Sequence, residues 1–394
     1  MLAFVMLTAT GASRIVNNMT ADYGAGRQAQ NEPAQVPLPG GVSMIFVERT
    51  DGTDGGFQRM VTSMQANGLH FYQTPAAPQG LIAHDDVVLL KINAQWDQRG
   101  GTNTDLIRAV IQAVVDHPAG FTGEVIVADN GQGIGSLNWS NANSANRDQS
   151  TLDVIRHFQA GGHRVTGVLW DTFTGVRVNE FSAGDMRDGF VVENNIRSSG
   201  LEISYPKFTT EFGTMVSFRE GIWNPAAGSY QRERLKVINM PVLKAHWTFQ
   251  VTGAVKNYMG VPSNALSSRR PHNSVGTGGM GTLMAETRVP ALNIMDMIWI
   301  GPDQGPRLNY ADALQLNLIA ASVDPVALDV WATRNVLMPE AANRRTVAWA
   351  APMNPTGTAP GTFGFWLRLS MNELLHAGVP VTMDEAQMLV IDNS

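Results

Sequence analysis

Short apolar runs alternate along the chain with segments whose apolar residues recur at helical spacing. Residues 86–93 form a nearly unbroken run of Val, Leu and Ile, which predicts a strand buried on both faces. Residues 105–115 carry apolar residues three and four positions apart, which predicts a helix with Asn103 or Thr104 as its N-cap. The same criteria predict strands at 42–47, 124–128 and 163–170 and a helix at 152–159.

This order of strands and helices is typical of an α/β protein with a mostly parallel sheet flanked by helices. We expect two lobes with a cleft between them. In such sheets, ligands bind beyond the carboxyl ends of the strands. Lys91, Asn93 and Asp129 all lie at the ends of predicted strands. The sequence therefore predicts that these three side chains lie near one another.

The second half of the chain continues the pattern less regularly. Residues 181–233 mix Gly, Asn, aromatic and charged residues, which predicts excursion loops with short strands. The remaining predictions are a strand at 234–243 that ends at Lys244, a helix at 249–261, a mobile surface loop at 263–287, a helix at 311–321 and a helix from Pro325 to Val336.

The domain organisation follows from these segments. Residues 42–394 are expected to form one α/β domain, with lobes at roughly 42–180 and 234–394 separated by the excursion 181–233. Residues 1–41 are expected to be an arm or the remnant of a leader, because an apolar start is followed by a stretch rich in Asn, Gln, Gly and Pro. The apolar start is also consistent with an ordered N-terminal strand.

Composition excludes several classes of function. The net charge of −6 and the lack of a basic stripe argue against nucleic-acid binding. The absence of cysteine excludes disulfides, cysteine-based zinc sites and an iron–sulfur cluster held by this chain. The apolar start is too short for a membrane span, so we expect no integral membrane segment. The sequence leaves open whether the protein forms a homo-oligomer.

Lysine is scarce and unusually placed. Of only five lysines, Lys91, Lys244 and Lys256 lie within apolar runs, whereas Lys207 and Lys236 have more ordinary surroundings. Lysine is rarely buried without a partner, and burial can shift its pKa into a useful range. These three positions are therefore the strongest indication of function in the sequence.

The densest group of polar residues lies at 240–260. Lys244 and His246 are two residues apart, which places them on one face of a strand, and Lys256 is followed by Asn257. Two ammonium groups, an imidazole and an amide favour a pocket for a carboxylate or phosphate, with Lys244, His246 and Lys256 as candidate catalytic residues. Lys91, Asn93 and Asn257 are then candidate ligand-binding residues. The alternative is that each lysine pairs with an aspartate and only stabilises the core.

Three aspartates in apolar settings are candidate ligands of a divalent cation such as Mg²⁺: Asp296, Asp324 and Asp329. They are also candidate counter-ions of the lysines. Asp324 precedes Pro325, so a role as helix N-cap is the simpler interpretation for it. Asp329 lies too far along the chain to share that cap and is a candidate partner of a pocket lysine.

Several of these segments together resemble the family called domain of unknown function 362. The resemblance lies in VLLKIN (88–93), TNTD (102–105), the strand with Lys244 and His246, TGAVKNYMG (252–260), NIMD (293–296), the turn 301–306 and ASVDPVALD (321–329). It spans roughly residues 85–335. The family has no settled general activity. Many relatives resemble iron–sulfur proteins with cysteine clusters, which this chain lacks, and relatives often carry export leaders.

The sequence therefore predicts an enzyme or binding protein that acts on a small anionic ligand through a Lys/His/Asn cluster, with a divalent cation as a candidate cofactor. The alternative is an exported, non-catalytic structural or self-assembling protein in which the cluster is a buried ion-pair network. Export is slightly favoured over a cytoplasmic location because of the family resemblance.

Overall fold

The computed structural model describes residues 41–394 except 52–54, 140–143, 146–148, 304 and 306–312. The predicted arm or leader remnant therefore lies, up to residue 40, outside the described residues.

Ten of the described strands form one sheet: β1 (Ser43–Arg49), β2 (Val87–Lys91), β3 (Glu124–Asp129), β4 (Val165–Leu169), β10 (Leu235–Asn239), β11 (Val242–His246), β12 (Gln250–Thr252), β13 (Leu292–Gly301), β14 (Leu314–Ser322) and β15 (Met388–Asn393). Along its main path the order is β15–β1–β14–β13–β10–β2–β3–β4, and β11 joins through β13 and also pairs with β12. Strands β13, β10, β2, β3 and β4 are parallel neighbours, while β14 is antiparallel to both β13 and β1. The predicted mostly parallel α/β sheet is confirmed.

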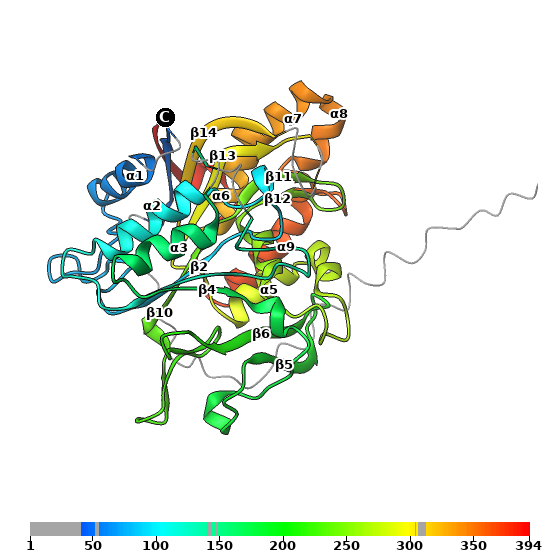
Figure 1. Cartoon of the computed structure of the whole chain (residues 1–394). Helices are drawn as coiled ribbons and strands as arrows, with labels where there is room; N and C mark the ends of the chain where they lie inside the picture. The colour runs from blue at the N-terminus through cyan, green and yellow to red at the C-terminus, as the bar shows by residue number, and fades with distance from the viewer. Residues whose placement is uncertain (1–40, 52–54, 140–143, 146–148, 304, 306–312) are drawn as a thin grey trace, which may run out of the picture. The chain divides into compact units, whose positions relative to one another are not determined.

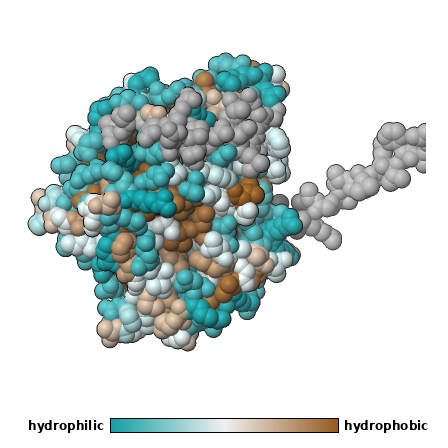
Figure 2. All heavy atoms as spheres, viewed as in Figure 1, coloured by the Kyte–Doolittle hydropathy of each residue, from teal (hydrophilic) through white to brown (hydrophobic). Residues whose placement is uncertain are grey.

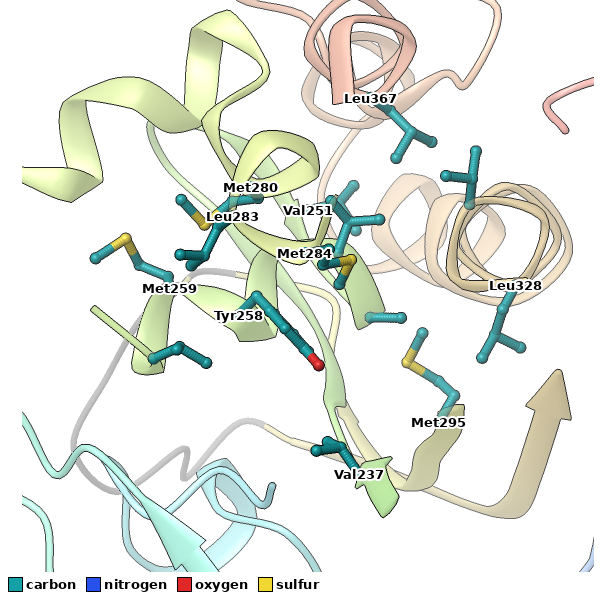
Figure 3. Packing of buried hydrophobic residues seen from close by; sticks show 14 of the residues in the cluster. Val237, Val251, Tyr258, Met259, Met280, Leu283, Met284, Met295, Leu328 and Leu367 are labelled. Carbon is teal, nitrogen blue, oxygen red and sulfur yellow. The ribbon is translucent and has the colours of Figure 1, made fainter. Parts of the chain in front are cut away.

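Helices lie on both faces of this sheet (Figure 1). The α-helices of the described residues are α1 (Gly55–Ala66), α2 (Thr104–Val115), α3 (Thr151–Ala160), α4 (Ala254–Asn257), α5 (Gly279–Glu286), α6 (Pro325–Ala332), α7 (Met338–Arg344), α8 (Val347–Ala350) and α9 (Phe363–His376). Because side chains alternate along a strand, β2 supplies two cores. Val88 and Leu90 share a buried cluster with residues of α1, α2 and α3. Val87 and Leu89 belong to the opposite cluster, which includes residues of α5, α6 and α9 and is shown in part in Figure 3.

The excursion 181–233 contains a second, antiparallel sheet: β5 (Gly189–Ile196), β6 (Glu202–Thr209), β7 (Met215–Ser217), β8 (Gly221–Asn224) and β9 (Ser229–Gln231). Phe190, Ile203 and Tyr205 of this sheet are buried in the same cluster as Val87 and Leu89 of β2. The expected short strands therefore form a regular sheet that shares a core with the parallel sheet. The division of the chain into two lobes stays a prediction.

Several local predictions are confirmed together with their caps. Helix α2 begins as expected after Asn103, whose side-chain oxygen accepts a hydrogen bond from the Asp105 N–H at 2.9 Å. Helix α6 begins at Pro325, and Asp324 caps it by accepting hydrogen bonds from the backbone of Val326 and Ala327. These signals are local in the sequence, which is why the pattern alone located them.

Two predictions in the region of the lysines were wrong. Residues 234–243 do not form one strand: β10 ends at Asn239, and β11 begins after Pro241 and pairs with β13 instead of β2. Proline has no N–H to donate, so an interruption of the ladder hydrogen bonds at this point costs little. Residues 249–261 do not form one helix, because 250–252 pair with β11 as β12, and the short α4 and a 3-10 helix at Tyr258–Gly260 follow.

Two further segments also differ from expectation. Residues 263–287 are not a surface loop: they include a 3-10 helix at Pro271–Thr277 and the buried helix α5. At 311–321, the described part is the strand β14, which lies between β1 and β13. Leu314, Leu316 and Leu318 alternate there with polar residues, a strand pattern that the following alanines obscured.

On the face seen in Figure 2, hydrophobic residues near the centre are bordered by hydrophilic ones. In the described part of the chain, none of the helices is long and apolar enough to cross a membrane.

The contact between α5 and α9 depends on Gly281, and this gives a first prediction. A Cβ atom at Gly281 would lie 2.1 Å from the carbonyl oxygen of Ser370 in α9. Although alanine is the better helix former, Gly281→Ala should therefore lower the free energy of unfolding by about 1–3 kcal/mol. Gly276→Ala is the matched control, because a Cβ there meets nothing closer than 3.9 Å. Urea unfolding measures both; a Gly281→Ala variant as stable as the wild type contradicts the close packing.

Candidate functional site

All six side chains predicted to line a cleft lie around a single cavity of about 130 Å³. They are Lys91, Asn93, Lys244, His246, Lys256 and Asn257. The rest of the wall is formed by Gln95, Trp96, Asp129, Asn130, Gln132, Thr252, Met259, Gly260 and His272. The structure therefore brings the predicted residues together from three separate parts of the chain.

The cavity lies at the carboxyl ends of parallel strands. β2 ends at Lys91, and its neighbour β3 ends at Asp129. On the other side of β2, Asn239 ends β10 and pairs in register with Lys91. This is the edge at which open α/β sheets bind ligands. It explains why residues after different strands converge.

Lys91 and Asp129 form a buried ion pair at this edge. The Nζ atom of Lys91 lies 2.6 Å from Oδ1 of Asp129, and both side chains are almost fully buried. Lys91 also donates a hydrogen bond to the carbonyl oxygen of Ile92 at 2.8 Å, and Oδ2 of Asp129 accepts one from the Ala94 N–H at 2.7 Å. Burial lowers the pKa of Lys91 and raises that of Asp129, and their mutual attraction opposes both shifts.

Gly260 makes room for this pair. A Cβ atom at Gly260 would lie 2.4 Å from Oδ1 of Asp129 and 2.8 Å from Nζ of Lys91. The carbonyl oxygen of Gly260 accepts a hydrogen bond from the indole N–H of buried Trp170 at 2.8 Å. The backbone at residue 260 is therefore fixed against the ion pair.

Lys244 is buried on β11 and is held by a backbone group. Its Nζ donates a hydrogen bond to the carbonyl oxygen of Gly100 at 2.6 Å. Burial lowers the pKa of Lys244 well below its usual value, and the charge of Lys256 lowers it further, while Asp129 and Asp296 oppose the shift. Asp296 is itself buried, and burial raises its pKa to about 6. Its carboxylate accepts hydrogen bonds from the backbone of Asn103 and Ile298.

Lys256 differs from the other two lysines of the cavity. Its side chain is 7% exposed, and among the described residues its Nζ has no ion pair and no hydrogen bond. The nearest favourable contact is the ring of Phe249, whose centre lies 5.6 Å from Nζ. Burial lowers the pKa of Lys256 to about 8. This lysine is therefore a buried cation that faces the cavity without a counter-ion.

The position of Lys256 is fixed by what surrounds α4. The carboxylate of Asp329 accepts hydrogen bonds from the backbone N–H groups of Ala254 at 2.5 Å and Val255 at 3.0 Å. After α4, Tyr258 and Met259 belong to the same buried cluster as α5 (Figure 3). The sequence made Asp329 a candidate partner of a pocket lysine. In the structure its carboxylate instead holds the backbone of α4, the helix that carries Lys256.

His246 enters the cavity as a neutral donor. Its Nδ1 accepts hydrogen bonds from the backbone N–H groups of Thr248 and Phe249, so in the neutral ring the proton is on Nε2. Burial lowers the pKa of His246 to about 2, and the charge of Lys256 adds to the shift. His272 lies beside it, with ring centres 5.8 Å apart, and burial lowers its pKa to about 4.

A chain of buried asparagines supports the cavity, and the sequence analysis missed most of it. The amide nitrogen of Asn257 donates to Oδ1 of Asn239 at 2.8 Å, and the amide of Asn239 donates to Oδ1 of Asn293 at 2.9 Å. Asn293 in turn donates to the carbonyl oxygen of Ser322. The sequence signal that could have indicated this chain of hydrogen bonds is a single Asn within each apolar strand, Asn239 in β10 and Asn293 in β13.

Asn93 has an unsatisfied group at the cavity. Its Oδ1 is buried and has no hydrogen-bond partner among the described residues, although its backbone N–H donates to the Thr102 hydroxyl. A buried acceptor without a donor is costly. Because Asn93 lines the cavity, a ligand with a donor group would satisfy it.

The three aspartates proposed as metal ligands do not form a common site. Asp324 caps α6, while Asp296 and Asp329 each accept hydrogen bonds from the backbone of other segments. No group of three or more His, Cys, Asp or Glu among the described residues could hold a metal ion. The predicted divalent cation therefore has no support in the described part of the chain.

Lys207 is a lysine that the sequence analysis misjudged. It was placed in ordinary surroundings, yet it is fully buried in β6. Its Nζ lies 3.9 Å from the centre of the Phe181 ring and donates a hydrogen bond to the carbonyl oxygen of Asp185. Lys207 does not line the cavity. It is therefore a natural control for the buried cavity lysines.

Comparison with known protein families gives a match within the second half of the chain. The model of the family described as "Domain of unknown function (DUF362)" matches residues 232–334, and the family resemblance is confirmed over this segment. It contains Lys244, His246, Lys256 and Asn257, whereas Lys91 and Asn93 precede it. No match was found among curated proteins or among solved structures.

The buried charge of Lys256 leads to a prediction about pH. In the folded chain its pKa is about 8, against 10.5 for an ordinary lysine. Between these values the unfolded chain binds more protons, so this group makes the folded state more stable as pH rises from about 8 to 10.5. Lys256→Met should remove that dependence. In a buffer free of polyvalent anions at pH 7, it should raise the free energy of unfolding by on the order of 3 kcal/mol.

Urea unfolding of the wild type and the variant at pH 7 and pH 10 measures this effect. The other titrating groups are the same in both proteins, so their effect cancels in the difference between the two free energies of unfolding. This difference should shrink as pH rises from 7 to 10. A Lys256→Met variant that is equally destabilised at both pH values would show instead that the ammonium group is stabilised by a partner.

Proposed function

We propose that the cavity binds a small anionic molecule whose charged group is a carboxylate or a phosphate. The single observation that carries this proposal is the ammonium group of Lys256, which faces the cavity without a counter-ion among the described residues and lies close enough to Lys244 for their charges to interact. Such an arrangement is unfavourable unless an anion joins it.

The balance of charge in the cavity wall supports the same conclusion. Three lysines line the cavity but only one aspartate does. Lys91 is neutralised by Asp129 at 2.6 Å, and both histidines are neutral at physiological pH because their pKa values are about 2 and 4. Among the described residues of the wall, this leaves no carboxylate to neutralise a protonated Lys256.

Each polar group then has a role in binding. Lys244 and Lys256 attract the anionic group, and His246 donates a hydrogen bond from Nε2. This binding role for His246 replaces the catalytic role expected from the sequence, because an imidazole with a pKa of about 2 is a poor base at neutral pH. The unsatisfied Oδ1 of Asn93 accepts a hydrogen bond from a hydroxyl or amino group of the ligand.

The alternative, a structural protein with a buried ion-pair network, accounts for only part of the cluster. The Lys91–Asp129 pair fits that interpretation. Lys256 does not, since a lysine that only stabilises the core would have a partner. The observations therefore favour a ligand site.

Thermal unfolding in the presence of inorganic phosphate or acetate tests the proposal. A ligand that binds only the folded state stabilises it by RT ln(1 + [L]/Kd), about 2.7 kcal/mol at a hundredfold excess over Kd. We expect at least one of the two anions to raise the Tm of the wild type in a saturable way. Chloride at equal ionic strength serves as the salt control.

Two variants locate the effect in the cavity. Lys256→Met should weaken the affinity for the anion by about ten- to a hundredfold, as expected for a hydrogen bond to a charged group. Lys207→Met removes a lysine of similar burial outside the cavity and should leave the affinity unchanged. Equal losses in both variants, or no saturable shift with either anion, would refute the proposal.

A further inference from the structure

Within the described part of the chain, Lys256 is the cavity lysine whose amine has no hydrogen bond and no ion pair. Lys91 is engaged by Asp129 and by the carbonyl oxygen of Ile92, and Lys244 is engaged by the carbonyl oxygen of Gly100. The ring of Phe249 lies with its centre 5.6 Å from Nζ of Lys256. A free, buried primary amine beside a second cation is the arrangement that activates a lysine as a nucleophile.

We propose that Lys256 forms a covalent imine with the carbonyl carbon of a small 2-oxo acid whose carboxylate is bound by Lys244. This inference rests on the proposed anion site and adds the substrate class and a covalent step. The other side chains of the wall fit it: His246 presents an N–H from Nε2 to the ligand.

The step is balanced without a further reactant. The lone pair of neutral Lys256 Nζ attacks the carbonyl carbon, and the electrons of the C=O double bond move to the oxygen, which takes up a proton. The resulting carbinolamine loses that oxygen as water, and a C=N bond forms. Counting from the ammonium form of Lys256, one water leaves and the positive charge stays on the iminium nitrogen. Nothing is oxidised or reduced.

The size of the cavity and the state of the amine support this class of ligand. A cavity of about 130 Å³ has room for a small molecule. In a 2-oxo acid the carboxylate and the reactive carbonyl are adjacent, which fits a site in which Lys244 and Lys256 are close enough for their charges to interact. Burial lowers the pKa of Lys256 to about 8, so an appreciable fraction of the amine is neutral near physiological pH.

Hydride trapping tests the imine directly. The full-length protein is incubated with pyruvate as the probe and reduced with sodium cyanoborohydride, which converts an imine to a stable secondary amine. Intact mass and peptide mapping then locate the adduct. We expect Lys256 to be labelled at least about tenfold faster than partly exposed Lys236. Labelling of Lys256 no faster than Lys236 would overturn the proposal.

Two further measurements use the wild type alone, so that they do not depend on the folding of a variant. Acetone, which has the same carbonyl group but no carboxylate, should label Lys256 at least about tenfold more slowly than pyruvate. An excess of an anion shown to bind the protein should suppress labelling by pyruvate. Equal labelling by acetone and pyruvate would contradict the role of Lys244.

Variants complete the assignment. Lys256→Met should abolish the adduct, and Lys207→Met should retain it at Lys256. A saturable rise in Tm with pyruvate but no trapped adduct would refute the covalent step and leave the anion site standing. No rise in Tm with pyruvate, phosphate or acetate, together with no adduct, would refute both.

Discussion

The buried ion pair between Lys91 and Asp129 is the interaction on which the site depends. It joins the carboxyl ends of β2 and β3, and the backbone of Gly260 is packed directly against it. Removing one partner of such a pair would leave an uncompensated charge in the interior, at a cost of about 3–5 kcal/mol. The pair therefore fixes the wall of the cavity while neutralising one of its three lysines.

The three cavity lysines show how the same side chain takes different properties from its surroundings. Lys91 has a carboxylate, Lys244 a backbone carbonyl, and Lys256 only an aromatic ring. Burial lowers the pKa of all three. What separates them is the compensation that each receives. The uncompensated Lys256 is the one that a ligand would stabilise most.

Around these charges, buried polar groups hold the backbone in place. Asn257, Asn239 and Asn293 are linked by hydrogen bonds across β10 and β13. Asp329 ties the start of α4 to α6. Networks in which most members are satisfied make a site rigid, because each side chain is held by its neighbour. The exception is Asn93, which lines the cavity and whose buried Oδ1 has no hydrogen-bond partner among the described residues.

The sequence by itself determined the sheet class, the start of a helix at Asn103 or Thr104 and the burial of Lys91, Lys244 and Lys256, because each depends on residues a few positions away. It did not determine that 311–321 contribute a strand or that 263–287 include a buried helix, since both follow from packing against distant segments. Only the tertiary structure decided which lysine pairs with Asp129 and which has no partner. Charge compensation is a property of the space around a side chain, and segments far apart in the chain make that space.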